Sequence, residues 1–243
     1  MMKNVFLIGA MKCGTNTLYH ALRSHPAAAA PEKKELDYFI KPSHSQPYSA
    51  YFPITCDTEF TLDGTTQYSK YPHFPHMVEA IHQMNRDARI IYLARDPVDR
   101  FESNIAHHIA RAEDVTLRTW RKSKKYQAAL DYGRYYTQIG PYANRFGRKR
   151  VFVGTFEDFV ANQTDFINRI CEFIGIYAAQ VRVPRERRNA RRDGHGAEQF
   201  MLSQDDETLV AKALQSDIDC LGYAFDLDVC TPWMRYQKAL HNV

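Results

Sequence analysis

The feature that most constrains this chain is a short apolar run that leads directly into a glycine-containing loop. The run is Asn4-Val5-Phe6-Leu7-Ile8, and the loop that follows is Gly9-Ala10-Met11-Lys12-Cys13-Gly14-Thr15-Asn16-Thr17. The run predicts a buried parallel strand over Val5–Ile8, and Thr15–Ser24 predicts a helix that ends before Pro26. Because backbone N–H groups and the positive end of a helix converge at such a junction, the loop predicts an anion site.

The loop nearly fits the phosphate-binding pattern of nucleoside triphosphatases, because four residues separate Gly9 from Gly14. In those proteins a lysine follows the second glycine, whereas Thr15 stands there in this chain and Lys12 lies two residues before that glycine. The apolar run Arg89–Ala94 then leads into Arg95, a cation where magnesium would require a carboxylate. We therefore expect Lys12 and Arg95 to supply charge in place of a metal. The alternative is a plain glycine turn between a strand and a helix.

Apolar patterning indicates that strands and helices alternate along the rest of the chain. Strands are expected at Phe60–Leu62, Arg89–Ala94 and Val151–Gly154. Helices are expected at Phe74–Met84, from Pro97 to about Arg111, at Gly133–Phe146, at Asn162–Ile174 and after an N-cap at Ser203, with one short helical turn at Glu35–Phe39. This order predicts an α/β chain with a P-loop-like three-layer fold, in which helices flank a central parallel sheet. One domain is expected over residues 1–243, with a linker at Val183–Ala197.

Composition narrows the classes of partner and compartment. The net charge of +4 is too small to indicate a nucleic-acid coat, and no nucleic-acid partner is expected. The five cysteines are irregularly spaced and include no CxxC pair, so a reducing, cytoplasmic location is expected rather than a disulfide framework or a zinc site. No stretch approaches the roughly 18 apolar residues that a membrane span requires. No signal peptide and no metal site are predicted.

Three blocks of the sequence match the motifs of one family. Lys12-Cys13-Gly14-Thr15-Asn16-Thr17-Leu18 fits K-x-G-T-x-x-L, Arg95-Asp96-Pro97-Val98-Asp99-Arg100-Phe101-Glu102-Ser103 fits R-[DN]-P-x-x-R-x-x-S, and Lys34-Glu35-Leu36-Asp37-Tyr38-Phe39 fits K-E-x-x-[FY]-F. With these blocks the chain resembles the sulfotransferases that use 3′-phosphoadenosine 5′-phosphosulfate (PAPS), in their carbohydrate (heparan-type) and bacterial branch. The resemblance is strong at the first two blocks and looser over most of the remaining chain.

The resemblance implies which residues bind the nucleotide. The 5′-phosphosulfate is expected at Lys12, Cys13, Gly14, Thr15, Asn16 and Thr17, where Lys12 would also stabilise the charge that develops as the S–O bond breaks. The 3′-phosphate is expected at Arg95 and Ser103. Arg191 and Arg192 are expected to close over the nucleotide, within an arginine-rich stretch that is equally compatible with a solvated basic loop. For Arg95 the alternative is an ion pair with Asp96 or Asp99.

The resemblance also implies the catalytic residues. Glu35 is expected to be the general base, although Lys33-Lys34-Glu35 is equally compatible with a solvated charge cluster. His107, together with His20 and His108, is a rival base, because histidine titrates in the right range. One departure stands out: the family segment E-K-T-P-x-Y has a lysine where this chain has Gly64. A second cation must therefore come from elsewhere in the chain.

The expected activity is transfer of a sulfuryl group from PAPS to a hydroxyl or amine, with 3′,5′-adenosine bisphosphate as the nucleotide product. The acceptor is expected to be a carbohydrate, a glycolipid or a small metabolite that enters a cleft near Glu35, Tyr68 and His107. Two alternatives stay open. One is a P-loop kinase or nucleotidase that uses ATP and magnesium, and the other is a non-catalytic anion-binding protein with the same fold.

Overall fold

A parallel sheet forms the centre of the molecule. The computed structural model describes residues 2–41, 43–111, 116, 119–178, 181 and 200–241. These residues form a five-stranded sheet with the strand order β2-β3-β1-β4-β5, and every neighbouring pair of strands is parallel. The strands are β1 (Lys3–Gly9), β2 (Ala28–Ala29), β3 (Phe60–Asp63), β4 (Arg89–Ala94) and β5 (Val151–Thr155).

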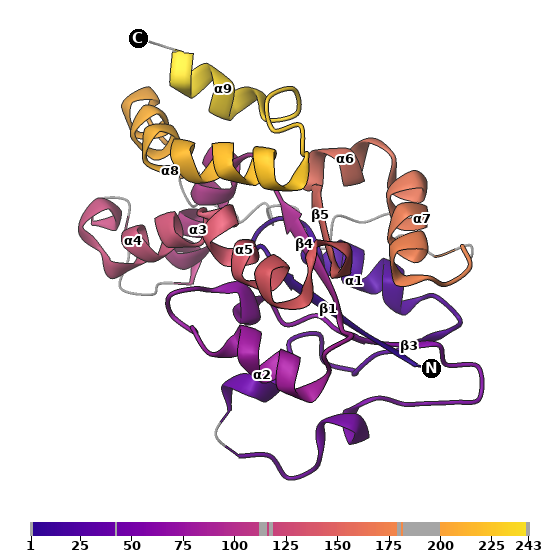
Figure 1. Ribbon diagram of the computed structural model, residues 1–243. Coiled ribbons are helices and arrows are strands. Elements are labelled where there is room, and N and C mark those ends of the chain that lie inside the picture. Colours follow the sequence, from indigo (N-terminus) through magenta and orange to yellow (C-terminus); the bar gives the residue numbers. More distant parts are fainter. Residues whose placement is uncertain are drawn as a thin grey trace.

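Helices cover both faces of this sheet. In Figure 1, α1 (Thr15–Arg23) and α7 (Gln163–Ile174) lie on one side of the strands, and α2 (Met77–Met84), α5 (Tyr135–Phe146) and α8 (Gln204–Phe225) lie on the other. The remaining helices of the described chain are α3 (Pro97–Ala110), α4 (Lys124–Asp131), α6 (Phe156–Ala161) and α9 (Met234–His241). The arrangement confirms the predicted α/β fold with a central parallel sheet between helical layers.

The core follows from the apolar strands, because a parallel sheet is covered on both faces. In the two central strands, the side chains of Phe6–Ile8 and Ile90–Ala94 are completely buried. Trp233, which lies far along the sequence, is also completely buried and joins the same core cluster. The segment after α8 therefore packs into the same core as the first strand.

Several sequence expectations are confirmed to within a residue or two. The strand over Arg89–Ala94 has the predicted bounds, and α3 begins at Pro97 as expected. Ser203 caps α8 through a complete capping box, in which its hydroxyl accepts from the Asp206 backbone N–H and the Asp206 carboxylate accepts from the Ser203 N–H. Each of these signals is local, since it depends on a few consecutive residues.

Two expectations are wrong. The helix predicted from Phe74 begins only at Met77, because Pro75 disfavours helical geometry at the residue before it. The helical turn predicted at Glu35–Phe39 is instead a 3₁₀ turn at Tyr38–Ile40. Asp37 has φ 57°, in the left-handed region, so the backbone changes direction there, and Glu35 lies before the turn, outside any helix or strand.

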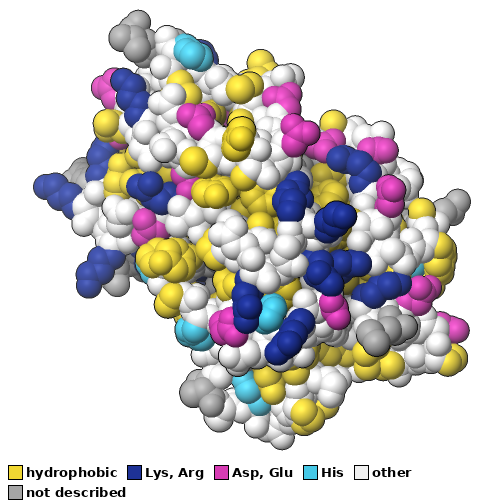
Figure 2. Space-filling view, in the orientation of Figure 1, with side chains coloured by type: hydrophobic (Ala, Val, Ile, Leu, Met, Phe, Trp, Pro, Cys, Tyr) yellow, Lys and Arg dark blue, Asp and Glu magenta, His cyan; other side chains and the backbone are white. Residues whose placement is uncertain are grey.

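The surface carries many charged side chains of both signs. Figure 2 shows Lys and Arg side chains gathered over the middle and right of one face, with acidic side chains among them. Ion pairs join arginines to carboxylates, at Arg145–Glu79, Arg150–Asp87 and Arg169–Asp158. Among the helices in the described ranges, none has both the length and the apolar character that a membrane crossing demands.

Candidate active site

Several of the predicted site residues lie where the parallel strands end. The carboxyl ends of β3, β1, β4 and β5 lie side by side at one edge of the sheet, because these strands are neighbours and run in the same direction. The loop from Ala10 to Gly14 follows β1, Arg95 follows β4, and Phe156 follows β5. In open α/β sheets this edge is the usual place for a ligand.

The loop after β1 exposes backbone donors at the start of a helix. Gly14 is the N-cap of α1, has φ 80°, and provides no side-chain cap for the first turn. The first N–H groups of a helix have no partner within the helix, so those of α1 are directed outward from the loop. A Cβ at Gly14 would lie 2.5 Å from the Phe156 ring, so only glycine fits between the loop and α6.

The Cys13 side chain lies in the core, unlike the backbone donors of the loop. Its side chain is fully buried, and its thiol lies 3.7 Å from the Met11 carbonyl oxygen. Burial raises the pKa of the Cys13 thiol to about 12, the largest influence on that group. The contribution of Cys13 to an anion site is therefore limited to its backbone.

Arg95 and Lys12 belong to the same part of the edge. The Arg95 Nη1 donates to the Lys12 carbonyl oxygen at 3.4 Å, and the guanidinium lies 5.1 Å from the centre of the Phe156 ring. Burial, and then the charge of Arg95, lower the pKa of the Lys12 ammonium. Arg95 also contacts Asp99 at 3.5 Å, which is the ion pair that the sequence offered as an alternative. The structure thus contains both the loop contact and the ion pair.

The predicted residues Ser103 and His107 lie on the same face of α3 as Asp99, the ion-pair partner of Arg95. Asp99, Ser103 and His107 follow at intervals of four residues, which places them in a row along a helix. Ser103 and His107 are both partly exposed. With a rise of about 1.5 Å per residue, Ser103 lies about 6 Å beyond Asp99 and His107 about 6 Å further. Ser103 therefore lies at the middle of α3, about two turns beyond Arg95, and His107 lies near the far end of the helix.

The backbone around Arg95 is held by buried groups. The Tyr135 hydroxyl donates to the Arg95 carbonyl oxygen at 2.8 Å, and the Asp96 N–H donates to Glu157 Oε1 at 3.0 Å. Asp96 caps α3 by accepting from two of its backbone N–H groups. The indole N–H of Trp233 donates to Glu157 Oε2 at 3.0 Å. Arg95 is therefore fixed by three segments distant in sequence.

The chain between α8 and the end of α9 adds a second support on α3. Arg235 forms ion pairs with Asp99 at 2.9 Å, Glu102 at 2.7 Å and Glu207 at 2.6 Å. The next residue, Tyr236, donates its backbone N–H to Asp96 Oδ2 at 2.9 Å. Asp99 thus divides its two oxygens between Arg235 and Arg95.

Glu35 lies beside the end of β3, the strand next to β1 in the sheet. Its Oε2 accepts from the Thr66 backbone N–H at 2.7 Å, and its Oε1 accepts from Lys34 Nζ at 2.7 Å. The Glu35 side chain is 36% exposed, whereas that of Lys34 is 12% exposed. The charge cluster anticipated around Glu35 is therefore an ordered pair at the edge of the sheet.

Asp63, the last residue of β3, is a buried carboxylate with four donors. Its Oδ1 accepts from the Thr65 N–H at 3.0 Å and the Thr65 hydroxyl at 2.7 Å, and its Oδ2 accepts from the hydroxyls of Tyr48 and Tyr68 at 3.2 Å each. Burial nevertheless raises the pKa of Asp63 to about 6, against the opposing effect of these hydrogen bonds. Tyr68, expected to border the acceptor, is buried and occupied by this contact.

This raised pKa makes stability depend on pH. Between about pH 4 and pH 6 the folded protein retains a proton on Asp63 that the unfolded chain releases, so stability falls as the pH rises. We expect the free energy of unfolding of the native chain to fall by about 3 kcal/mol more over this range than that of Asp63→Asn. Urea denaturation at several pH values measures the difference. Parallel pH dependences for the two proteins would contradict the prediction.

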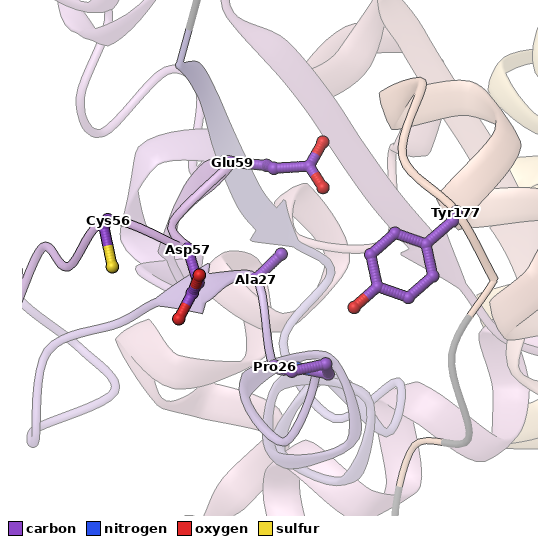
Figure 3. A pocket seen from close by; sticks show the side chains of 6 residues that line it. All are labelled: Pro26, Ala27, Cys56, Asp57, Glu59 and Tyr177. Atoms are coloured by element: carbon purple, nitrogen blue, oxygen red, sulfur yellow. The ribbon is translucent and has the colours of Figure 1, made fainter.

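Some predicted features lie elsewhere. Arg191 and Arg192, and the predicted linker, lie outside the described residues. A separate pocket of about 420 Å³ lies before the amino end of β3 and contains none of the predicted site residues. Figure 3 shows its lining side chains, which are Pro26, Ala27, Cys56, Asp57, Glu59 and Tyr177. Within the described part of the chain, no group of three or more His, Cys, Asp or Glu side chains is placed to hold a metal ion.

Sequence reasoning missed several residues that shape the site. Phe156 borders both Gly14 and Arg95, and Glu157 fixes the Asp96 backbone. Both follow β5, so their place after a predicted strand was the signal that could have identified them. The contact between Lys34 and Glu35 had no comparable signal, since neighbouring opposite charges are common on solvated surfaces.

Comparison with known proteins identifies the family to which the sequence is similar. The sulfotransferase domain family matches residues 2–192. Human heparan sulfate glucosamine 3-O-sulfotransferase 3B1 is 25% identical over 182 residues, covering 70% of this chain and 45% of the relative, so the chain spans about half the length of such curated relatives. The mouse 3-O-sulfotransferase 3A1 is 24% identical over 180 residues, covering 70% of this chain and 45% of that protein.

A solved structure shares the fold over nearly the whole chain. The sulfotransferase from Alicyclobacillus acidocaldarius superimposes with a TM-score of 0.75 at 22% identity, covering 96% of this chain and 99% of that chain. These findings do not favour the kinase alternative. The family match covers most of the chain and includes the loop after β1 and the Arg95 segment, and on this basis the chain belongs to the sulfotransferase family.

Proposed function

We propose that this chain transfers a sulfuryl group from PAPS to a hydroxyl or amine of a carbohydrate, glycolipid or small-molecule acceptor. The observation that carries the proposal is the contact between two cationic residues at adjacent strand ends. Arg95 Nη1 lies 3.4 Å from the Lys12 carbonyl oxygen. A single bound nucleotide with a phosphate at each end of its ribose needs cations at two such neighbouring positions.

The loop after β1 suits the 5′-phosphate. The left-handed Gly14 and the uncapped first turn of α1 leave the backbone N–H groups of Thr15, Asn16 and Thr17 for an anion. The side chain of Cys13 is turned into the core, so nothing bulky from that residue covers the donors. Backbone donors of this kind are fixed in place before the ligand binds, which reduces the cost of ordering them.

Arg95 and Ser103 suit the 3′-phosphate. The Arg95 Nε is buried and has no partner among the described residues, and the contact of Arg95 with Asp99 is long, at 3.5 Å. A phosphate would therefore compete well for this guanidinium, because Arg–phosphate contacts are charge-assisted and often bidentate. Ser103, two turns along α3, adds a hydroxyl donor on the same face.

The transfer itself needs a proton acceptor and charge stabilisation. The acceptor oxygen or nitrogen attacks sulfur, the bond between sulfur and the bridging oxygen breaks, and the acceptor proton passes to Glu35. Lys12 stabilises the negative charge that forms on the departing phosphate. Glu35 is partly exposed at the sheet edge, which leaves its carboxylate accessible to an acceptor. His107 is the alternative base, farther along α3.

The acceptor class rests on the relatives. The name of the human relative specifies heparan sulfate glucosamine as its acceptor, and we extend to this chain only the wider classes given above. We also propose that residues 1–243 act as one domain, because one hydrophobic core includes residues from Val5 to Ala239. A cytoplasmic location remains a proposal, supported by five cysteines that are all free thiols.

The direct test is thermal denaturation with 3′,5′-adenosine bisphosphate, the nucleotide product. At a concentration of about 100 times Kd, a ligand that binds only the folded state adds about 2.7 kcal/mol of stability, which raises Tm by about 5–10 °C for a chain of this size. Adenosine 5′-monophosphate should give a clearly smaller shift because it lacks the 3′-phosphate. In Arg95→Met the two nucleotides should give similar shifts.

Arg89→Met is the matched control. Arg89 lies at the amino end of β4, the strand that Arg95 follows, 5.8 Å from the Phe173 ring and away from the proposed site. It should retain the difference between the two nucleotides. The absence of any shift with saturating bisphosphate in the native chain would overturn the proposed donor, and an unchanged difference in Arg95→Met would remove Arg95 from the 3′-phosphate site.

A further inference from the structure

The carboxylate of Glu35, the proposed base, accepts hydrogen bonds from Thr66 and from Lys34. Thr66 donates its backbone N–H to Glu35 Oε2 at 2.7 Å, and Lys34 Nζ donates to Glu35 Oε1 at 2.7 Å. Each carboxylate oxygen thus has one close donor, and the Thr66 hydroxyl, 3.3 Å from both oxygens, adds a longer shared contact. The orientation of the Glu35 carboxylate therefore depends directly on Lys34.

Lys34 is itself held in place. Its side chain is only 12% exposed, its Nζ donates to the Gly64 carbonyl oxygen at 2.8 Å, and its ammonium lies 5.9 Å from the centre of the Tyr19 ring. Lys33, the preceding residue, is exposed instead. A long side chain gives up much rotamer freedom when it is fixed in this way, so the contacts of Lys34 must offset that cost.

Gly64 provides the space that Lys34 uses. A Cβ at Gly64 would lie 2.5 Å from the Tyr19 ring and 3.0 Å from Lys34 Cγ. A side chain at position 64 would therefore clash with the Tyr19 ring and crowd Lys34 in its observed position. Gly64 is the position at which the sequence lacked an expected lysine, and the ammonium of Lys34 lies directly against its backbone.

We infer that Lys34 is the second cation of the site and the positioning residue for Glu35. It connects three parts of the site: Tyr19 on α1, which begins at the phosphate loop, Gly64 after β3, and the Glu35 carboxylate. Lys34 acts through Glu35 rather than on the nucleotide. The inference rests on the proposed function, in which Glu35 accepts the proton.

The test compares Lys34→Met with Lys33→Met, which removes the same charge one residue away from an exposed position. Transfer from PAPS is measured with the best acceptor among a glucosamine oligosaccharide, a glycolipid and a phenol. Lys34→Met should lower kcat by about 10- to 100-fold, the range of coupling between residues in one network. The Kd for 3′,5′-adenosine bisphosphate should stay within about twofold of the native value. Lys33→Met should match the native chain in both quantities.

A double-mutant cycle with Glu35→Ala separates positioning from a merely structural role. If Lys34 acts through Glu35, adding Lys34→Met to Glu35→Ala should cause little further loss of kcat. Losses that multiply in the double variant, a Lys34→Met kcat equal to that of Lys33→Met, or a large loss of nucleotide affinity would each overturn the inference. Failure of the proposed function looks different, because the native chain would then show neither transfer nor a thermal shift with the bisphosphate.

Discussion

Replacing Glu35 with glutamine is expected to lower kcat by about 10²- to 10⁴-fold, the contribution of a typical general base. Glutamine has nearly the same shape and can still accept from the Thr66 N–H, which Glu35 does now at 2.7 Å, but it cannot take up a proton at neutral pH. Affinity for 3′,5′-adenosine bisphosphate should change little, because no contact with the phosphate loop is lost. Steady-state transfer assays and nucleotide titrations measure the two effects.

Glu32→Gln is the control for this experiment, because Glu32 is exposed and lies three residues earlier in the same segment. It should behave as the native chain does. If Glu35→Gln retains its kcat while His107→Ala loses activity by a similar factor, the base is His107 and the assignment of Glu35 is wrong.

Replacing Lys12 with methionine is expected to lower kcat by about 10²- to 10³-fold, the cost of removing one donor that stabilises charge in a transition state. The backbone contact between the Lys12 carbonyl oxygen and Arg95 does not involve the ammonium, so the loop should keep its geometry. Binding of the bisphosphate should weaken far less than kcat falls. Kinetics under saturating PAPS, with separate titration of the product nucleotide, test this expectation.

Lys149→Met provides the comparison, since Lys149 is an exposed lysine that lies before β5 rather than at the site edge. Its kcat should be unchanged. A Lys12→Met variant that keeps its kcat but binds nucleotide poorly would assign Lys12 to ground-state binding, contrary to the role proposed for it.

Strands and caps with strong local signals could be predicted closely from the sequence. Arg89–Ala94 is apolar after its first residue, contains two isoleucines and a tyrosine, and becomes a strand with the predicted bounds. By contrast, α6 has six residues, too few to establish a helical period, and the sequence did not predict it. The left-handed backbone at Asp37, which moved the expected helical turn, also has no clear signal, since aspartate adopts this geometry only occasionally.

The site residues also differ in how far the sequence could predict them. The loop after β1 and the Arg95 motif could be predicted because each lies on consecutive residues at a strand end. The environment of Glu35 could not, because it depends on contacts between segments about thirty residues apart and on the lack of a side chain at Gly64. The sequence showed that a lysine was absent there, and only the packed structure shows which ammonium lies nearby.

Trp233, Arg235 and Tyr236 contact residues next to Arg95, and these contacts predict covariation between distant parts of the sequence. The matched family segment ends at residue 192, yet Arg235 holds Asp99 and Tyr236 holds Asp96. Positions beyond the shared segment thus restrain the guanidinium that is matched within it. Substitutions near residue 235 are therefore expected to covary with substitutions near residue 99 among homologous sequences. An alignment limited to the shared segment would contain only one residue of each contacting pair.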